Sequence, residues 1–269
     1  MAEEVSLQVY MEGLSRVDRV VDDSGYAFTA LDVIDKGLVS LEPIRSYSHL
    51  LYVNASKNQI VDTMPLSELQ YLVCVDLSDN ALTAPPVLPQ QYLQSLDISG
   101  NQITALQGLE SGSLSELKIN GNALTSLVGL QNLPLLTTLE ASRNSIEDIS
   151  SLANDASAKL ETLHLDENKL ETFTGIENLP LLTSVSFQQN YVETLTAVQQ
   201  LEQLTKLTTL NLTGNPVTQV EDYRPSIVLL APTLTQLDGE PLTDEDRLAA
   251  VELKQRREAE AAEQEEANE

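Results

Sequence analysis

The chain has 269 residues, and its 41 acidic side chains outnumber 15 lysines and arginines to give a net charge of −26 at pH 7. Phosphates and anionic lipid headgroups attract lysine and arginine, so a chain this acidic is not expected to bind nucleic acid or a membrane surface. Its first residues lack a basic stretch followed by an apolar one, and no apolar run reaches the roughly 18–20 residues of a membrane span. A single cysteine, Cys74, is typical of a reducing, intracellular compartment.

Residues 1–27 form an N-terminal extension that lies outside the pattern of the rest of the chain. Leu14, Val17, Val20 and Val21 recur at helical spacing, with a glycine on either side of the group. This spacing predicts a short helix that caps the first structural unit of the chain. A mobile acidic leader is the alternative for the same residues.

From residue 28 to residue 217 the chain repeats the template LxxLxLxxNxΦ, where Φ is an aliphatic residue. The clearest copy is LTTLNLTGNPV at 207–217, and about nine copies follow one another at intervals of 21 to 25 residues. This pattern and period are those of the leucine-rich repeat. They predict an α/β fold, a right-handed solenoid with a curved parallel sheet on its concave face and short helices or 3₁₀ turns on its convex face.

One copy of the repeat shows how its residues are divided between core and solvent. Leu117 and Ile119 are two residues apart, which places both side chains on one face of a strand, and Glu116 and Lys118 take the opposite, wet face. Asn122 follows where the chain turns inward, and its amide can pair with buried backbone groups of that turn and of neighbouring coils. We expect the same structural role for the whole Asn column, which comprises Asn58, Asn80, Asn101, Asn122, Asn144, Asn168, Asn190 and Asn215, with Lys36 at the equivalent position of the first coil.

The outward-facing strand positions form the candidate site of the chain. They should line one curved, acidic strip, a kind of surface that solenoids use to bind protein partners. Carboxylates on adjacent strands repel one another, so we expect the partner to offer a basic segment. The alternative is that these polar residues serve solubility alone. The candidate partner-binding residues are Asp32, Tyr52, Asn54, Asp76, Asp97, Lys118, Glu140 and His164, and Ser186 and Asn211 continue the same strip.

The sequence contains no constellation of residues that would support catalysis. Its two histidines are His49 and His164, and His164 has Asp166 nearby on the same wet face. No nucleophile with a base, no glycine-rich phosphate loop and no metal-ligand spacing accompanies this pair. We therefore expect no enzyme activity, no catalytic, metal-binding or cofactor-binding residues, no cofactor and no small-molecule substrate.

The repeat pattern changes near the C-terminus. Residues 218–241 are predicted to form a C-terminal cap, with a helix that opens at 222–225, where Pro225 suits the first turn, and one last short strand. Residues 242–269 are predicted to form an acidic helical tail with Thr243 as its N-cap. Six acids and no base follow Arg257, so helicity should fade there. The apolar residues before that point predict a second contact element, formed by Leu242, Leu248, Val251 and Leu253.

Two stretches of the sequence resemble known families. The cap residues NPVTQVEDYRPSIVLLAPTLTQLDG, 215–239, resemble the C-terminal cap of the SDS22-like leucine-rich repeat proteins. The stretch IRSYSHLLYVNASKNQI, 44–60, resembles the opening repeat of the family of leucine-rich repeat-containing protein 23, a component of the ciliary radial spoke. The long last coil and the acidic-then-basic helix after the cap are similar to that family as well. Lys36 and the short, acid-ended C-terminus depart from it.

The resemblance implies a non-enzymatic scaffold for protein–protein interaction in the ciliary or flagellar axoneme, in a radial spoke that supports motility. The location implied is the cytoskeleton of a cilium or flagellum within the cytoplasm, and the partners implied are other axonemal and radial-spoke proteins. Two alternatives come from the wider family. One is a regulatory subunit that docks on protein phosphatase 1, as SDS22 does, and the other is a splicing-particle adaptor.

Overall fold

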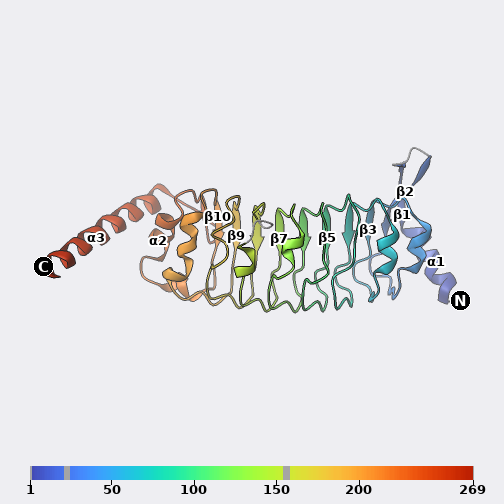
Figure 1. Cartoon of the computed structure of the whole chain (residues 1–269), viewed down its shortest axis with the longest axis horizontal. Coiled ribbons are helices and arrows are strands. Elements are labelled where there is room, and N and C mark those ends of the chain that lie inside the picture. Colours follow the sequence, from blue (N-terminus) through green and yellow to red (C-terminus); the bar gives the residue numbers. More distant parts are fainter. Residues whose placement is uncertain (1, 21–24, 154–157, 269) are drawn as a thin grey trace.

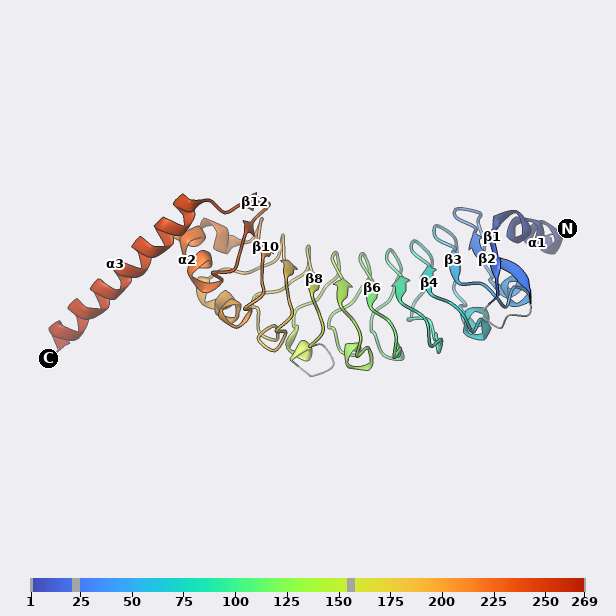
Figure 2. The ribbon, with the colours of Figure 1, turned by 90° about the horizontal axis from the view of Figure 1, so that it is seen from above.

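The computed structural model describes residues 2–20, 25–153 and 158–268, with side chains described from 7 to 264 within those ranges. In this part of the chain the strands form one sheet whose order follows the sequence, so that each strand pairs with the next one along the chain. Figure 2 shows the sheet along the inner side of an arc, with short helical turns along the outer side. The predicted α/β fold class and the leucine-rich-repeat solenoid are confirmed.

The repeat strands after the first are three residues long, and their central side chains are buried. Leu117, for example, is fully buried between the half-exposed side chains of Glu116 and Lys118, because alternate residues of a strand point to opposite faces. The strands of the repeat coils, each parallel to the next, are β2 (Tyr26–Asp32), β3 (Tyr52–Asn54), β4 (Cys74–Asp76), β5 (Ser95–Asp97), β6 (Glu116–Lys118), β7 (Thr138–Glu140), β8 (Thr162–His164), β9 (Ser184–Ser186) and β10 (Thr209–Asn211).

A left-handed backbone turn follows each of these strands. The residue directly before each Asn-column position has a positive φ, a conformation that costs most side chains about 1–2 kcal/mol. A Cβ on Gly100 would lie 2.1 Å from Asp79 Oδ1, so a larger residue there would displace the Asp79 side chain. The turn residues are Asp35, Lys57, Asp79, Gly100, Gly121, Arg143, Glu167, Gln189 and Gly214.

Short 3₁₀ helices return the chain along the convex side to the next strand. They are η1 (Glu42–Ser46), η2 (Met64–Glu68), η3 (Leu130–Asn132), η4 (Ser150–Leu152) and η6 (Leu195–Gln203). The nine-residue η6 fills the long last coil, and the Thr194 hydroxyl accepts a hydrogen bond from the Ala197 amide at its start. The aliphatic side chains of all coils form one continuous core, because a single coil cannot bury its own leucines.

The N-terminal extension folds differently from its prediction. The helix α1 (Ala2–Gly13) precedes the predicted segment, and Leu14–Arg19 is strand β1, antiparallel to β2. Tyr10 on α1 is fully buried, and its hydroxyl donates a hydrogen bond to the Ser40 carbonyl oxygen at 2.7 Å. The prediction from helical spacing was wrong because β1 forms hydrogen bonds with the backbone groups on the edge of β2, which a helix at this place would leave unpaired. Val21 lies outside the described residues.

The C-terminal cap covers the last coil and leads into a long helix (Figure 1). Pro225 lies in the first turn of α2, as predicted, whereas the hairpin between the last two strands was not predicted. The final helix continues to Asn268 instead of fading after Arg257, because its Ala, Glu and Gln residues are good helix formers. The elements are η7 (Pro216–Gln219), α2 (Tyr223–Leu230), β11 (Gln236–Leu237), β12 (Glu240–Pro241) and α3 (Asp244–Asn268).

Candidate interaction surface

The sheet register brings most of the predicted partner-binding residues into one line. Asp32 is paired with Asn54, Asn54 with Asp76 and Asp76 with Asp97, and the pairing continues strand by strand. We call this line the trailing row, because it contains the last residue of each strand from β2 to β10. It consists of Asp32, Asn54, Asp76, Asp97, Lys118, Glu140, His164, Ser186 and Asn211.

A second line of outward side chains runs parallel to the trailing row, two residues earlier on each strand. Tyr52 is the one predicted site residue in this leading row. Glu116 is a charged member of the row that the prediction left out. Its place two residues before Lys118 in the repeat template is the signal that would have found it. The leading row consists of Ala30, Tyr52, Cys74, Ser95, Glu116, Thr138, Thr162, Ser184 and Thr209.

The N-terminal half of the trailing row has carboxylates on neighbouring strands. Asp76 Oδ1 accepts hydrogen bonds from the Ser78 amide at 2.9 Å and the Ser78 hydroxyl at 2.6 Å, and Asp97 Oδ1 accepts one from the Ser99 amide at 2.9 Å. Burial, together with the charge of Asp76, raises the pKa of Asp97 against the opposing effects of Ser99 and Lys118. The ionised form of Asp97 is therefore less favoured in the folded protein than in an unperturbed carboxyl group, and a basic group placed beside it would stabilise that form.

Lys118 is the one basic side chain of the two rows, and it is already paired. Its Nζ lies 3.2 Å from Glu116 Oε1 and 3.5 Å from Glu140 Oε1. Burial opposes its charge, yet the contact with Glu116 and the surrounding acids raise its pKa overall. Ser95 donates a hydrogen bond to Glu116 at 2.9 Å, and Asn120 donates one to Glu140 at 3.1 Å. The charge of Lys118 therefore offsets the charges of Glu116 and Glu140, and the other carboxylates of the row keep their negative charge.

The C-terminal end of the trailing row, formed by His164, Ser186 and Asn211, contains no acidic residue, lysine or arginine. His164 is half-exposed on β8, and Ser186 is buried beside it on β9. Ser186 Oγ donates a hydrogen bond to Asp166 Oδ1 at 2.5 Å, and the Gln188 amide donates to the same oxygen at 2.8 Å. Asp166 thus joins two successive coils, which is a structural role. Charge is concentrated in the N-terminal half of the face.

The Asn column joins successive coils through side-chain amides. Asn122 Nδ2 donates to the carbonyl oxygens of Ile98 in the preceding coil and of Ile119 in its own turn, at 3.0 and 3.2 Å. Its Oδ1 accepts a hydrogen bond from the Ile103 amide at 2.9 Å. Lys36 stands at the end of the column, where β1 and not another coil lies beside β2. Equivalent bonds are made by Asn58, Asn80, Asn101, Asn144, Asn168, Asn190 and Asn215.

Replacing Asn122 by alanine is expected to lower the free energy of unfolding by about 1–3 kcal/mol, because backbone groups inside the turn lose their partners. Thermal and denaturant melting would measure the change. The matched control is Gln102→Ala, which removes an exposed amide from the neighbouring coil and should leave the melting curve unchanged. An Asn122→Ala protein that melts like the wild type would show that the column does not stabilise the stack.

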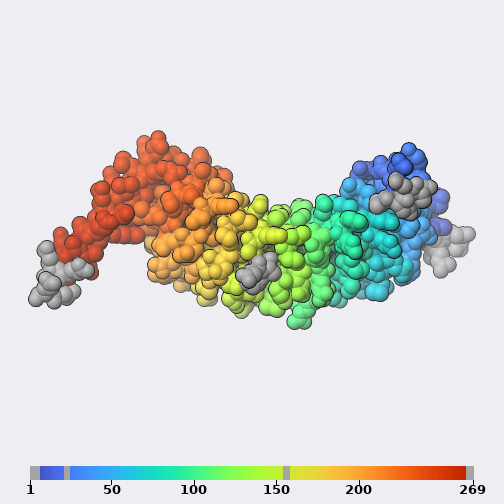
Figure 3. All heavy atoms as spheres, turned by 45° about the horizontal axis from the view of Figure 1, so that its top comes forward, coloured from blue at the N-terminus to red at the C-terminus, as the bar shows by residue number. Residues whose placement is uncertain are grey.

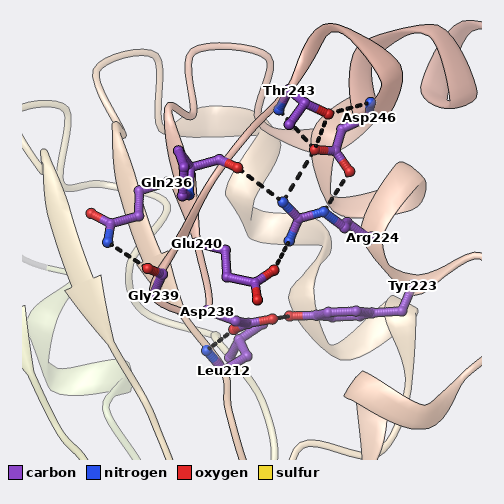
Figure 4. Close-up of polar contacts among 10 residues, drawn as sticks. Leu212, Tyr223, Arg224, Gln236, Asp238, Gly239, Glu240, Thr243 and Asp246 are labelled. Carbon is purple, nitrogen blue, oxygen red and sulfur yellow. Dashed lines mark hydrogen bonds and ion pairs between the residues drawn. The ribbon is translucent and has the colours of Figure 1, made fainter.

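A second cluster of polar contacts joins the C-terminal cap to α3 (Figure 4). Arg224 on α2 donates from Nε to Asp246 Oδ1 at 2.5 Å, and from Nη2 to Asp246 Oδ2 at 3.2 Å and to the Pro241 carbonyl oxygen at 3.3 Å. The Thr243 amide donates to Asp246 Oδ2 at 2.8 Å, and Thr243 Oγ1 accepts from the Asp246 amide at 3.2 Å, which together make a capping box. The bonds from Arg224 favour the ionised carboxylate and hold the pKa of Asp246 well below its usual range. Asp246 therefore both caps α3 and attaches its first turn to α2.

A buried tyrosine fixes the other side of the same cap. The Tyr223 hydroxyl donates a hydrogen bond to Asp238 Oδ2 at 2.9 Å, and Asp238 Oδ1 accepts one from the Leu212 amide at 2.7 Å (Figure 4). Burial, together with the charge of Asp238, raises the pKa of Tyr223. The pair connects α2 to the last repeat coil and to the turn between β11 and β12, so the cap and the solenoid form one rigid end.

The apolar residues predicted as a contact element on α3 are divided between two environments. Leu253 is buried together with Ala250 where α3 meets α2, whereas Leu248 and Val251 are 60% and 51% exposed. Leu242 is partly buried against the core. The exposed pair points away from the solenoid's own packing, and its contact with a partner stays a prediction.

Replacing Asp246 by asparagine is expected to loosen α3, because the charged contact with Arg224 is lost. Hydrogen bonds to charged groups contribute about 1.5–3 kcal/mol, so amide protons of the first turns of α3 should exchange about tenfold faster or more. The folded pKa of Asp246 is depressed, so its stabilising effect is complete above the unfolded pKa and declines as the pH falls below it. Wild type and variant should therefore converge in acid.

Hydrogen exchange at neutral pH and across the acid range measures this effect. Asp244→Asn is the matched control, because Asp244 is an exposed residue of the same helical turn and should give a smaller change from the helix dipole alone. Equal exchange rates for the Asp246→Asn and wild-type helices at neutral pH would contradict the assignment.

Cys74 lies half-buried in the leading row as a free thiol. Burial, with the charge of Glu116 nearby, raises its pKa, so the thiol stays protonated and unreactive at neutral pH. Among the described residues, no group of three or more His, Cys, Asp and Glu side chains is placed to hold a metal ion. Over the same parts of the chain, no helix combines the length and the apolar character needed to cross a membrane.

Comparison with known proteins identifies the repeat by sequence. A family model described as Leucine-rich repeat matches residues 137–267, and another, described as Leucine Rich repeat, matches residues 90–106. Leucine-rich repeat-containing protein 23 of Bos taurus is 34% identical over 71 residues, which are 26% of this chain and 21% of that protein. Dynein axonemal assembly factor 11 of Trypanosoma brucei brucei is 42% identical over 60 residues, which are 22% of this chain and 16% of that protein. Each match thus spans a small part of the relative.

Solved structures match over more of the chain. The crystal structure of internalin C2 from Listeria monocytogenes has a TM-score of 0.56 at 22% identity and covers 78% of this chain and 80% of that one. At this identity the likeness shows the fold alone. Because the matching family models describe the same repeat that forms the coils of the sheet, the chain is a leucine-rich-repeat solenoid, and part of it is similar to leucine-rich repeat-containing protein 23.

Proposed function

We propose that the chain is a non-enzymatic scaffold for protein–protein interaction in the axoneme of a cilium or flagellum, as part of a radial spoke. The observation that carries the proposal is the acidic half of the trailing row, where Asp76 and Asp97 lie side by side on an open, curved face. The similarity to a protein named dynein axonemal assembly factor supports the axonemal location. The resemblance of 44–60 to the radial-spoke family supports the finer assignment.

The partner is a basic segment of another axonemal protein. Asp76 and Asp97 repel each other, and burial already disfavours the charge of Asp97. A lysine or arginine between them would remove the repulsion and form charge-assisted hydrogen bonds. Because Lys118 is held by its own acids, it competes little with a basic partner for Asp76 and Asp97. This electrostatic contact predicts binding that weakens as salt is raised.

The location is tested by isolating axonemes from motile cells that express a tagged form of the full chain. The protein is expected to stay with the axoneme after detergent removes the membrane and matrix, and to be released by raised salt. A protein released completely by detergent at low salt would contradict an axonemal scaffold. Co-purification with protein phosphatase 1 or with splicing particles, in the absence of axonemal proteins, would support the corresponding alternative from the wider family.

A further inference from the structure

Phe28 is exposed, whereas the equivalent residue of every later coil is buried. It occupies the first aliphatic position of the repeat template, and it is 45% exposed. The cause lies in β2, which continues straight through this position into the hairpin with β1 and does not turn towards the core. The equivalent residues of the later coils are all buried; they are Leu50, Leu72, Leu93, Leu114, Leu136, Leu160, Leu182 and Leu207.

Phe28 shares its face of the hairpin with two other exposed apolar side chains. Val17 is its cross-strand partner, and Tyr26 lies two residues before it on β2, so all three point to the same side. Val17 is 58% exposed and Tyr26 is 76% exposed. We call these three residues the hairpin face. Large aromatic side chains that lie together on a surface are typical of the anchor points of protein interfaces.

The hairpin face is continuous with the concave surface. Alternate residues of β2 place Phe28 on the same side as Asp32 of the trailing row, through Ala30, which pairs with Tyr52 of β3. In Figure 1, β1 and β2 rise beyond the ends of the neighbouring strands, and Figure 3 shows the N-terminal end standing above the hollowed middle of the molecule. A segment that lies along the acidic half of the trailing row would therefore meet the hairpin face at its end.

The positive charge of Arg16 sets the orientation of such a segment along the face. It takes a left-handed backbone conformation, with φ of 55°, and its guanidinium carbon lies 4.5 Å above the centre of the Tyr52 ring. A basic side chain of the partner would be repelled at this point, between the hairpin face and the acidic row. The apolar part of the partner belongs on the hairpin side of Arg16, and its basic part belongs beyond Asp32.

We propose that the hairpin face is an anchor site for a large apolar side chain of the same basic segment that binds the acidic half of the trailing row. This inference rests on the proposed function. Phe28 and Asp32 are four residue steps apart along β2, about 13 Å, and Asp76 lies two strands further across the sheet, about 10 Å. An extended chain advances about 3.3 Å per residue, so the apolar residue precedes or follows a pair of basic residues by about four to six positions.

The test uses fluorescent peptides and the full chain. The probe has a tryptophan at one end, two lysines at the other and four serine or threonine residues between them, and it is made in both chain directions. One control peptide has serine in place of tryptophan, and another has tryptophan directly beside the lysines. In one direction the probe is expected to bind about tenfold more tightly than both controls, because only it reaches both sites.

Two sets of variants separate the anchor from the acidic row. Phe28→Ser with Tyr26→Ser, and independently Val17→Ser, should bring the probe down to the affinity of the serine peptide. The matched control, Tyr92→Ser with Tyr191→Ser, removes exposed tyrosines outside both rows and should keep the tenfold difference. Near-ultraviolet circular dichroism shows whether the variants are folded.

The outcomes distinguish the two proposals. If the lysine-bearing peptides bind but tryptophan adds nothing, or adds as much in the hairpin variants, the anchor site is wrong while the acidic docking face stands. If no peptide binds, or if Asp76→Asn with Asp97→Asn leaves the binding of every peptide unchanged, the docking face itself is wrong.

Discussion

Replacing Asp76 and Asp97 together by lysine is expected to abolish the docking of a basic partner on the concave face. The two residues are paired neighbours on β4 and β5, so the double change places two positive charges at the centre of the proposed contact. Each charge-assisted hydrogen bond contributes about 1.5–3 kcal/mol, and each 1.4 kcal/mol corresponds to about a tenfold change in affinity. Loss of two such bonds weakens binding by about a hundredfold or more, and the repulsion between the new lysines and the basic partner weakens it further.

A milder double change separates charge from folding. Lysine cannot accept the hydrogen bonds that Asp76 and Asp97 take from Ser78 and Ser99, so the lysine variant also loses turn contacts. Asparagine can accept them, because Asn54 at the equivalent position accepts bonds from the Ser56 amide and hydroxyl at 3.0 and 2.8 Å. Asp76→Asn with Asp97→Asn should therefore weaken binding by about tenfold or more while keeping the turns intact.

The direction in which the asparagine variant changes the free energy of unfolding follows from the pKa of Asp97. The folded pKa of Asp97 is raised, so its ionised form destabilises the fold above the unfolded pKa, and the penalty disappears as the pH falls. Asp97→Asn removes that penalty. The free energy of unfolding at neutral pH should therefore be equal to or above that of the wild type. A lower value would mean that the carboxylate supports the fold.

Pull-down from axonemal extract at low and at moderate salt measures the binding effect, with circular dichroism as the control for folding. Glu171→Lys with Glu193→Lys is the matched control, because it changes the net charge equally at two exposed positions outside the two rows. If the Asp76→Lys, Asp97→Lys protein recovers the same partners at the same salt, the trailing row serves solubility, and the partner surface has to be sought on the convex side or at the ends.

The sequence predicts the middle of this molecule well, because each coil repeats the environment of the one before it. Leu117 is buried and Lys118 faces outward for the same reason as their equivalents on every neighbouring strand, so one template determines the sheet, its register and both rows. Even the left-handed turns follow the template. Their residues include Lys57, Arg143 and Gln189, so the turn is recognisable from its position before the Asn column and not from its residue type.

The ends could not be predicted in the same way, because their neighbours do not repeat. Helical spacing in Leu14–Arg19 competes with the open edge of β2, and the edge determines the outcome. Phe28 fits the template yet lies on the surface, since β2 continues straight through this position into the hairpin with β1. The bond between Arg224 and Asp246 joins residues 22 positions apart, and neither residue type signals the contact in the sequence.

Truncation after Asn215 is expected to convert the protein from a monomer into an aggregate. The cap covers the open end of the core with Ile227, Leu234 and Leu237, each fully buried. Without them, the aliphatic side chains of the last coil would face water, and each such exposure costs about 1.5–3 kcal/mol. A solenoid end without a polar cap offers a continuous apolar patch, to which the same patch of a second molecule can bind.

Light scattering and size-exclusion chromatography of the truncated protein measure this effect. The matched control is truncation after Arg257, which removes most of the acidic tail but keeps α2, β11 and the contacts of Arg224 with Asp246 and of Arg257 with Ser226. That protein should stay monomeric and melt close to the wild type, which would show that the loss of acidic charge alone does not cause association. A soluble monomer after truncation at Asn215 would mean that the last coil tolerates solvent, and that the role of residues 218–241 is to attach α3 and not to close the core.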